Sequence, residues 1–478
     1  MCGTANGGSG APPADRRGVA MQQPASPIAI EGSLAMRLAR HWAELARLAW
    51  PVMLSRAGLL TLTLVDIVMV GRFGTGALAH MAMGYSVFVP IMVTGIGAMV
   101  GIIAIVSQRW GAGDRTGAAE AFGHGLRWAL TVGAAASLVI ALGEPFLRLI
   151  GHDPGLVAGG GLIARWLAPG ALLQVLFVAC SFYLESTRRV LPGLVYMAAA
   201  NLANLALNAW LIGGGWGLPA LGAEGAAIAS VLARVVMTAG ILIHVLMLPE
   251  MRRARGRHRA AGGWAAGRGL RRIGHAGAAA MFFETMAFAA LNQVAAFISP
   301  EALAAYSIAH QVEAMVFMVA LGLSVATAVR VGNAWGAGLA AEARFAAWSG
   351  LAATMLTVAA CSGLIVAGAG RLGSLFSEDP GLVARTAPLF VILAVSLIFD
   401  GGQAVMGQVN RALGDSWGTT ACFFIAFWLV MVPLGLVLGL HTRLEEAGLF
   451  LATACGTFAA VILLSWRFAR LSRRRGAA

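Results

Sequence analysis

The chain has 478 residues, of which 59% are hydrophobic and only 12% are charged, against about 25% charged residues in ordinary soluble domains. Its formal net charge of +13 rests wholly on arginine, because the sequence contains no lysine. A phosphate loop of the GxxxxGKS or GxxxxGKT type, which requires a lysine, is therefore excluded. Neither an HExxH zinc motif nor a GxSxG nucleophile elbow occurs. This composition predicts a protein that crosses the lipid bilayer many times and is not an enzyme.

The amino-terminal segment precedes the first apolar run. It is rich in Gly, Ala, Pro and Ser up to Glu31 and lacks the apolar core of a signal peptide. We expect residues 1–44 to form a disordered cytosolic tail, with Met21 as an alternative start to Met1.

Apolar runs long enough to cross a hydrocarbon core of roughly 30 Å as helices occupy most of the remaining chain. There are twelve of them, at residues 48–71, 77–107, 121–143, 161–184, 190–213, 222–248, 276–298, 302–332, 345–369, 381–409, 417–440 and 446–468. The predicted fold class is an all-α polytopic membrane protein with twelve transmembrane helices.

The arginines predict the orientation of these helices. The loops that lie on the same side of the membrane as the amino terminus hold most of the loop arginines. The loops on the opposite side hold only Arg72, Arg148, Arg371 and Arg443. Because arginine-rich loops stay in the cytosol, both termini are expected to be cytosolic. This arrangement also explains the basic charge without a nucleic acid partner.

Short motifs recur at a nearly constant offset and indicate a tandem repeat. SQRWGAGD at 107–114 matches GNAWGAGL at 332–339, and HDPGLVA at 152–158 matches EDPGLVA at 378–384. Six spans separate the copies, so the halves have the same orientation and form parallel repeats. Such repeats build a cavity between two bundles that rock against each other, which suggests transport.

The repeat defines the expected domains. These are a tail at 1–44, an N-lobe at 45–248, a basic cytosolic linker at 249–275, a C-lobe at 276–468 and a basic cytosolic tail at 469–478.

Three carboxylates lie well inside the spans, where each costs about 2.5 to 3.5 kcal/mol on insertion scales. Glu284 and Asp400 are at similar depth and predict one site in the C-lobe. Asp66 is expected beside Asn204 and Asn208, which share one helix face. These acids suit reversible protonation, or binding of a monovalent cation such as Na⁺ at Glu284 and Asp400. Purely structural hydrogen bonding is the alternative, above all for the asparagines.

Other polar residues are candidates for the lining of a cavity. Asn292 shares a helix face with Glu284, Gln403 follows Asp400 by one turn, and Gln311 lies early in the eighth span.

Further ionisable groups lie in apolar runs. His310 is expected to pack or hydrogen-bond, and Glu313 is a candidate fourth buried acid. Arg56 and Arg234 are interpreted as paired or snorkelling side chains rather than as cavity groups.

The motifs VDIVMVGRFGTGALA at 65–79, SQRWGAGD at 107–114, the segment at 302–338 and NRALGD at 410–415 resemble those of the MATE (multidrug and toxic compound extrusion) family. The resemblance covers about residues 45–468 and is to the NorM-type bacterial branch. It implies an antiporter in the bacterial inner membrane that exports cationic or lipophilic compounds against an inward flow of Na⁺ or H⁺.

The family's acidic residues carry over onto Glu284, Asp400 and Asp66, and its polar pair onto Asn204 and Asn208. Ser396 stands where the family places an aromatic hydroxyl one turn before Asp400, which favours proton coupling over a sodium site.

The expected function is therefore secondary drug antiport by a monomer, with a small-molecule substrate and no cofactor besides the coupling ion. The alternative is an exporter of a lipid-linked or polar metabolite on the same scaffold. That alternative requires arginines facing a cavity, and none is evident in the sequence. A membrane-embedded enzyme and a passive channel fit the residues less well.

Overall fold

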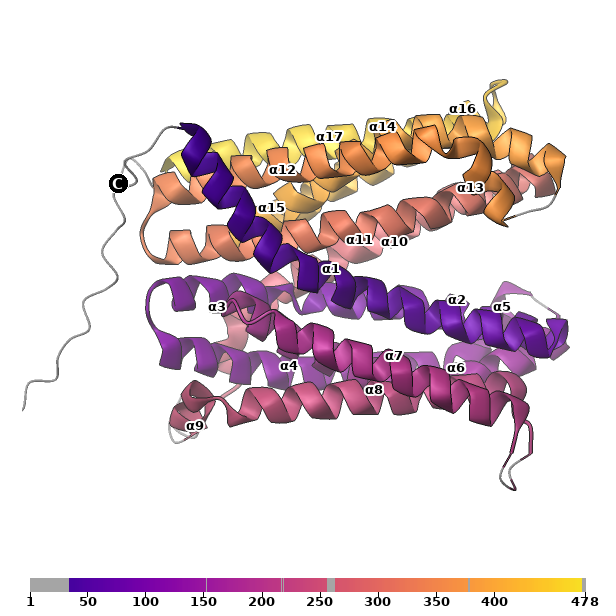
Figure 1. Ribbon diagram of the computed structural model, residues 1–478, viewed down its shortest axis with the longest axis horizontal. Helices are drawn as coiled ribbons and strands as arrows, with labels where there is room; N and C mark the ends of the chain where they lie inside the picture. The colour runs from indigo at the N-terminus through magenta and orange to yellow at the C-terminus, as the bar shows by residue number, and fades with distance from the viewer. Residues whose placement is uncertain are drawn as a thin grey trace, which may run out of the picture.

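A computed structural model describes residues 34–151, 153–215, 217, 219–255, 263–376 and 379–474. All regular elements in this part of the chain are helices, arranged in two bundles that lie side by side (Figure 1). The N-lobe contains α1 (Leu34–Phe73), α2 (Thr75–Ala98), α3 (Val100–Gly111), α4 (Arg115–Ala141), α5 (Gly143–Ile150), α6 (Pro154–Ser186), α7 (Leu191–Gly213) and α8 (Gly222–Met247). The short helices α9 (Pro249–Arg255) and η1 (Ala265–Gly267) connect the lobes.

The C-lobe repeats this plan. It contains α10 (Arg268–Ile298), α11 (Pro300–Gly336), α12 (Ala340–Ala367), α13 (Ala369–Phe376), α14 (Pro380–Ala412), α15 (Trp417–Phe424), the π-helical η2 (Ile425–Met431), α16 (Val432–Leu440) and α17 (Glu445–Arg474). Twelve helical segments of the described residues are long and apolar enough to cross a membrane. The predicted fold class and number of spans are therefore confirmed.

The boundaries of the predicted tail and linker were wrong in two places. Helix α1 begins at Leu34, so residues 34–44 are helical instead of disordered, while residues 1–33 lie outside the described part. The early turns of α1 are held by packing, because Leu45 and Ala49 join Leu323 of α11 in one apolar cluster. The seventh span begins at Arg268, inside the segment assigned to the linker.

The repeated motifs adopt the same local structure in both lobes. Asp153 and Asp379 cap the amino termini of α6 and α14, and their carboxylates accept backbone hydrogen bonds from the glycines two residues on (3.0 and 2.9 Å). The last glycine of each WGAG motif has a left-handed φ of 79°, at Gly113 and Gly338. The tandem repeat is thus present at the level of individual turns.

The two WGAG motifs also pack against each other across the interface between the lobes. A Cβ added to Gly111 would lie 2.0 Å from the carbonyl oxygen of Asn333, and one added to Gly336 would lie 1.9 Å from that of Gln108. Only glycine permits this approach. Beside it, Gln108 Nε2 donates to the carbonyl of Ala412 at 2.6 Å. We call this contact the glycine seam, and it joins the lobes at the end where α3, α11 and α14 terminate.

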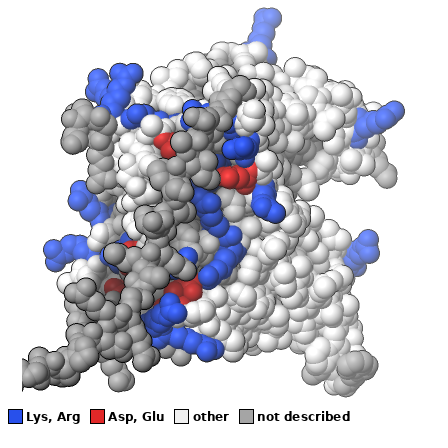
Figure 2. Space-filling model, turned by 60° about the vertical axis from the view of Figure 1, so that its left-hand side comes forward, with Lys and Arg blue, Asp and Glu red and all other residues white. Residues whose placement is uncertain are grey.

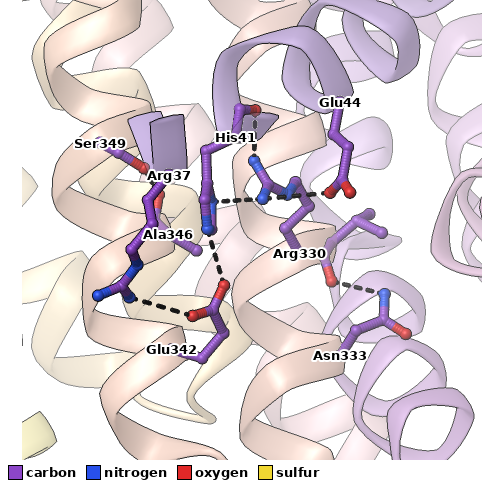
Figure 3. A network of polar contacts seen from close by, with 9 residues as sticks. Arg37, His41, Glu44, Arg330, Asn333, Glu342, Ala346 and Ser349 are labelled. Carbon is purple, nitrogen blue, oxygen red and sulfur yellow. Dashed lines mark hydrogen bonds and ion pairs between the residues drawn. The ribbon is translucent and has the colours of Figure 1, made fainter. Parts of the chain in front are cut away.

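A charged network joins the lobes at the same end (Figure 3). Arg330 of α11 donates to the backbone carbonyl of His41 at 2.7 Å and lies 3.3 Å from Glu44 of α1. His41 Nδ1 faces the Arg330 guanidinium at 2.5 Å, and its Nε2 lies 2.8 Å from Glu342 of α12. Because arginine only donates, Nδ1 accepts and Nε2 donates to Glu342. The first helix of the N-lobe is therefore attached to the C-lobe.

Charged side chains gather over this end of the molecule, whereas the flank of the bundles is mainly uncharged (Figure 2). Large apolar side chains such as Leu138, Leu202 and Phe297 are exposed on the flanks. An apolar flank with a charged end is the surface expected of a bundle that stands across a bilayer.

We expect Gly111→Ala to separate the lobes at the glycine seam, because the new methyl group would overlap the Asn333 carbonyl oxygen. Spin labels are attached to cysteines that replace Arg115 and Ala340, the first residues of α4 and α12, in a protein without its native cysteines. Double electron–electron resonance then measures the distance between the two labels. The mean distance between the labels should increase.

Gly363→Ala in α12 is the matched control, because nothing lies within 4 Å of the added Cβ. An unchanged distance distribution in Gly111→Ala would show that the seam does not hold the lobes together.

Candidate functional site

A cavity of about 430 Å³ is lined by α10, α11 and α14 of the C-lobe and by Val93 of α2 in the N-lobe. Most of its wall is apolar, and its ionisable lining residues are Glu284, His310, Glu313 and Asp400. Asn292 also lines it, as predicted from the helix face it shares with Glu284. Several acids facing one apolar cavity favour the binding of a cation or a proton there.

Gln403 connects the two acids that the sequence placed at equal depth. Its Nε2 donates to Glu284 Oε1 at 3.1 Å and to Asp400 Oδ1 at 3.0 Å. Its Oε1 is buried and has no hydrogen-bond partner. Two carboxylates therefore share one donor group, and an unused acceptor lies next to them. This corner has more acceptors than donors, so it can accept a proton or a small cation.

Glu313 extends the acidic cluster. It is only 3% exposed, and Oε2 contacts His310 Nδ1 at 3.0 Å, while Oε1 has no partner. The His310 ring is stacked between Phe288 and Tyr306, with ring centroids 5.5 and 5.9 Å away. The candidate fourth acid is thus buried, and the histidine both packs and hydrogen-bonds.

The N-lobe acid has a different environment. Asp66 accepts hydrogen bonds from Asn204 (3.0 Å) and Asn208 (2.6 Å) at Oδ1, and from Tyr85 (2.7 Å) and Ser230 at Oδ2. Asp66, both asparagines and Ser230 have no exposed surface. Each oxygen of Asp66 therefore accepts two hydrogen bonds, and the carboxylate has four buried partners.

The structure brings together the predicted group of Asp66 with Asn204 and Asn208. Sequence reasoning missed Tyr85 of α2 and Ser230 of α8. Tyr85 is one of only four tyrosines in the chain, which was a usable signal, whereas Ser230 lies in a run of small residues that gave none. Gln311 was predicted to line the cavity, but its side chain is exposed and lies outside the lining.

A second cavity, of about 260 Å³, lies next to the acidic one and shares Val93, Met281, Phe317 and Met318 with it. Its lining includes Arg56.

Arg234 and Gln174 also line the second cavity. The expectation that no arginine faces a cavity is therefore wrong for Arg56 and Arg234. Arg56 is nevertheless paired, as expected, with Glu185 at 2.9 Å. Both arginines were misjudged because the rotation of a helix about its axis decides whether an arginine points to a cavity or away from it.

Among the described residues, no group of three or more His, Cys, Asp or Glu side chains is placed to hold a metal ion. The Glu284 and Asp400 pair therefore remains the candidate for a transported ion. Two parallel bundles that enclose such acids and adjoining cavities form the architecture of a transporter.

Comparison with known proteins agrees with this class. The MatE family profile matches residues 51–210 and 277–437, one copy in each lobe. The chain is 33% identical to a probable multidrug resistance protein NorM of Caulobacter vibrioides, covering 90% of this chain and 92% of the relative. It is 30% identical to the multidrug resistance protein PmpM of Pseudomonas aeruginosa, covering 95% and 96%.

Solved structures share the fold. The eukaryotic MATE transporter AtDTX14 superposes with a TM-score of 0.82 at 20% identity, covering 92% of this chain and 98% of that one. An outward-facing multidrug resistance MATE transporter superposes with a TM-score of 0.81 at 19% identity, covering 93% and 99%. The chain belongs to the MatE family of multidrug efflux transporters, as its motifs indicated, and is a multi-pass membrane protein.

We expect Asp66→Asn to destabilise the fold more than Asp400→Asn. The amide at position 66 supplies one acceptor oxygen in place of two, so about half of the four buried donors lose the acceptor that they now use, at a cost of about 2 kcal/mol or more. Among the described residues, Asp400 accepts a side-chain hydrogen bond from Gln403 alone. Thermal unfolding of both variants in detergent checks this, and equal melting temperatures would contradict it.

Proposed function

We propose that the protein is a secondary antiporter that exports cationic or lipophilic compounds in exchange for inward H⁺ or Na⁺. The observation that supports this most directly is the pair of Glu284 and Asp400, which share Gln403 at the wall of an apolar cavity. A proton or Na⁺ at this pair and a cationic substrate in the cavity are attracted by the same negative charge. Each therefore displaces the other.

Exchange requires more than competition, because the two ligands have to favour different conformations. In our proposal the lobes supply these conformations by rocking against each other, with the glycine seam of Gly111 and Gly336 formed in one conformation and open in the other. In our proposal, loading the acids with the coupling ion favours one orientation of the lobes, and the bound substrate favours the other.

The orientation proposed for the chain also indicates on which side of the membrane the lobes are closed. With both termini in the cytosol, the arginine-rich end of the bundle and the glycine seam face the cytosol. The conformation described here is then closed on the cytosolic side of a bacterial inner membrane. The coupling ion is transported rather than resident, and the proposal includes no cofactor and requires only a monomer.

The second candidate is export of a lipid-linked or polar metabolite. Arg56 and Arg234 in the second cavity are the observation that favours it, because cationic groups would bind the anionic part of such a compound.

We expect Glu284→Gln and Asp400→Asn each to abolish efflux of a cationic dye while the protein still inserts and folds. Each change removes a negative charge that the coupling ion and the substrate share. Dye accumulation in cells that express equal amounts of each variant measures the effect. Glu301→Gln is the matched control, because Glu301 is an exposed acid at the start of α11. Full residual efflux in both cavity variants would rule out the mechanism.

Proteoliposomes with an imposed pH gradient or an imposed Na⁺ gradient, applied separately, identify the coupling ion. Ser396, in place of an aromatic hydroxyl, favours the proton, so we expect the pH gradient alone to drive dye transport. Equal dye movement without either gradient would indicate a passive pathway.

A further inference from the structure

The second cavity contains a buried arginine that forms no direct ion pair within the described part of the chain. Arg234 of α8 is 3% exposed, its Nη1 donates to the Ser230 carbonyl at 3.0 Å, and its guanidinium lies 5.2 Å from the centre of the Phe88 ring. Its Nε is buried without a hydrogen-bond partner. The ion pairs found among the described residues include none for Arg234. A buried guanidinium in this state is costly unless something else completes its hydrogen bonds.

Arg56 shows the contrast. It lines the same cavity, but Glu185 neutralises it at 2.9 Å, and both side chains are at least nine-tenths buried. Asp66 does not take this role for Arg234. Asp66 is connected to Arg234 through Ser230, whose hydroxyl donates to Asp66 and whose backbone carbonyl accepts from Arg234. The Asp66 oxygens already accept four hydrogen bonds. The uncompensated charge in the wall of the cavity is therefore that of Arg234.

A second unused donor lines the same cavity. Gln174 of α6 is 2% exposed, and its Nε2 has no hydrogen-bond partner. From the C-lobe, Gln408 adds an amide whose Oε1 is also without a partner. The N-lobe wall of the cavity thus offers two buried donors, one of them charged, within an apolar surface.

The position of the Arg234 side chain is fixed by packing. Its Cδ passes over Gly170 of α6, where an added Cβ would lie 3.2 Å away. Phe88 covers the guanidinium from the other direction. The group is therefore preorganised, which lowers the entropy lost when it binds a partner.

Both cavities can hold parts of one molecule, because Val93, Met281, Phe317 and Met318 line both. These shared residues are apolar and include two methionines, whose flexible thioethers adapt to ligands of different shape. At one end of the shared space are Glu284 and Asp400, and at the other is Arg234.

We propose that Arg234, assisted by Gln174, forms an anion subsite in the second cavity that binds a carboxylate of a substrate and so determines which substrates bind tightly. The carboxylate binds the guanidinium through charge-assisted hydrogen bonds that are strong where water is excluded. The amine of the same molecule lies toward the acids of the first cavity. This inference rests on the proposed function, since it assigns a binding role to residues of the same central space.

Rhodamine B and its ethyl ester form a suitable probe pair, because they share one aromatic cation and differ in whether the carboxylate is free. Fluorescence anisotropy with the purified full-length protein in detergent gives the Kd of each dye. We expect Arg234→Gln to raise the Kd of rhodamine B about tenfold or more, the size of one charge-assisted bond, and to leave that of the ester within about twofold.

Three further variants isolate the effect. Arg234→Lys keeps the charge and should retain part of the affinity for rhodamine B. Gln174→Leu should weaken binding of rhodamine B selectively but less, and it provides the test if Arg234→Gln fails to fold. Arg148→Gln removes an exposed arginine, with a side chain 69% accessible, and should change neither Kd.

Equal changes for both dyes in Arg234→Gln, or no change for either, would overturn the anion subsite. Wild-type protein that binds the ester and not rhodamine B would overturn it as well. Failure of the proposed antiport looks different: the selective binding effect would remain in detergent, while neither pH nor Na⁺ gradients would drive either dye in proteoliposomes.

Discussion

The closest approach of the two repeated WGAG motifs across the interface between the lobes is made by backbone atoms, without a side chain. At the glycine seam, Gly111 and Gly336 each lie against a backbone carbonyl of the opposite repeat, so the helices approach as closely as their backbones allow. Dispersion attraction at such a contact is lost steeply with separation. The seam is therefore either formed or absent, which suits two rigid lobes with two discrete arrangements. The repeat makes the contact reciprocal, because each copy supplies both a glycine and a carbonyl.

The polar groups do not follow the symmetry of the scaffold. In the N-lobe, Asp66 is enclosed and accepts hydrogen bonds from four donors. In the C-lobe, Glu284 and Asp400 share the single amide of Gln403 and face a cavity. A negative charge is therefore better compensated in the first lobe than in the second. The same backbone plan therefore holds an enclosed, fully hydrogen-bonded acid in one half and acids that face a cavity in the other.

Much of this arrangement is predictable from the sequence, because hydropathy and arginine placement determine depth along each span. Depth alone placed Glu284 with Asp400, and helix periodicity placed Asn204 with Asn208. Periodicity does not determine how a helix is rotated toward its neighbours, so the exposure of Gln311 and the cavity position of Arg234 were not predictable. Periodicity also does not show which helices are adjacent. For that reason Tyr85 and Ser230 were not predicted as partners of Asp66. The helical start of α1 depends on Leu323, far along the chain.

The glycine seam has a consequence for the tolerance of the chain to substitution. A contact between a glycine and a carbonyl restricts residue type on one side only, since every amino acid has the carbonyl. Asn333 is constrained by its burial, with 6% of its surface exposed, but its side chain donates to the Val329 carbonyl within its own helix and not across the seam. By contrast, the Gln108 amide also reaches Ala412. Two residues that match in the sequence repeat are thus under unequal mutational constraint, although their backbones perform the same task.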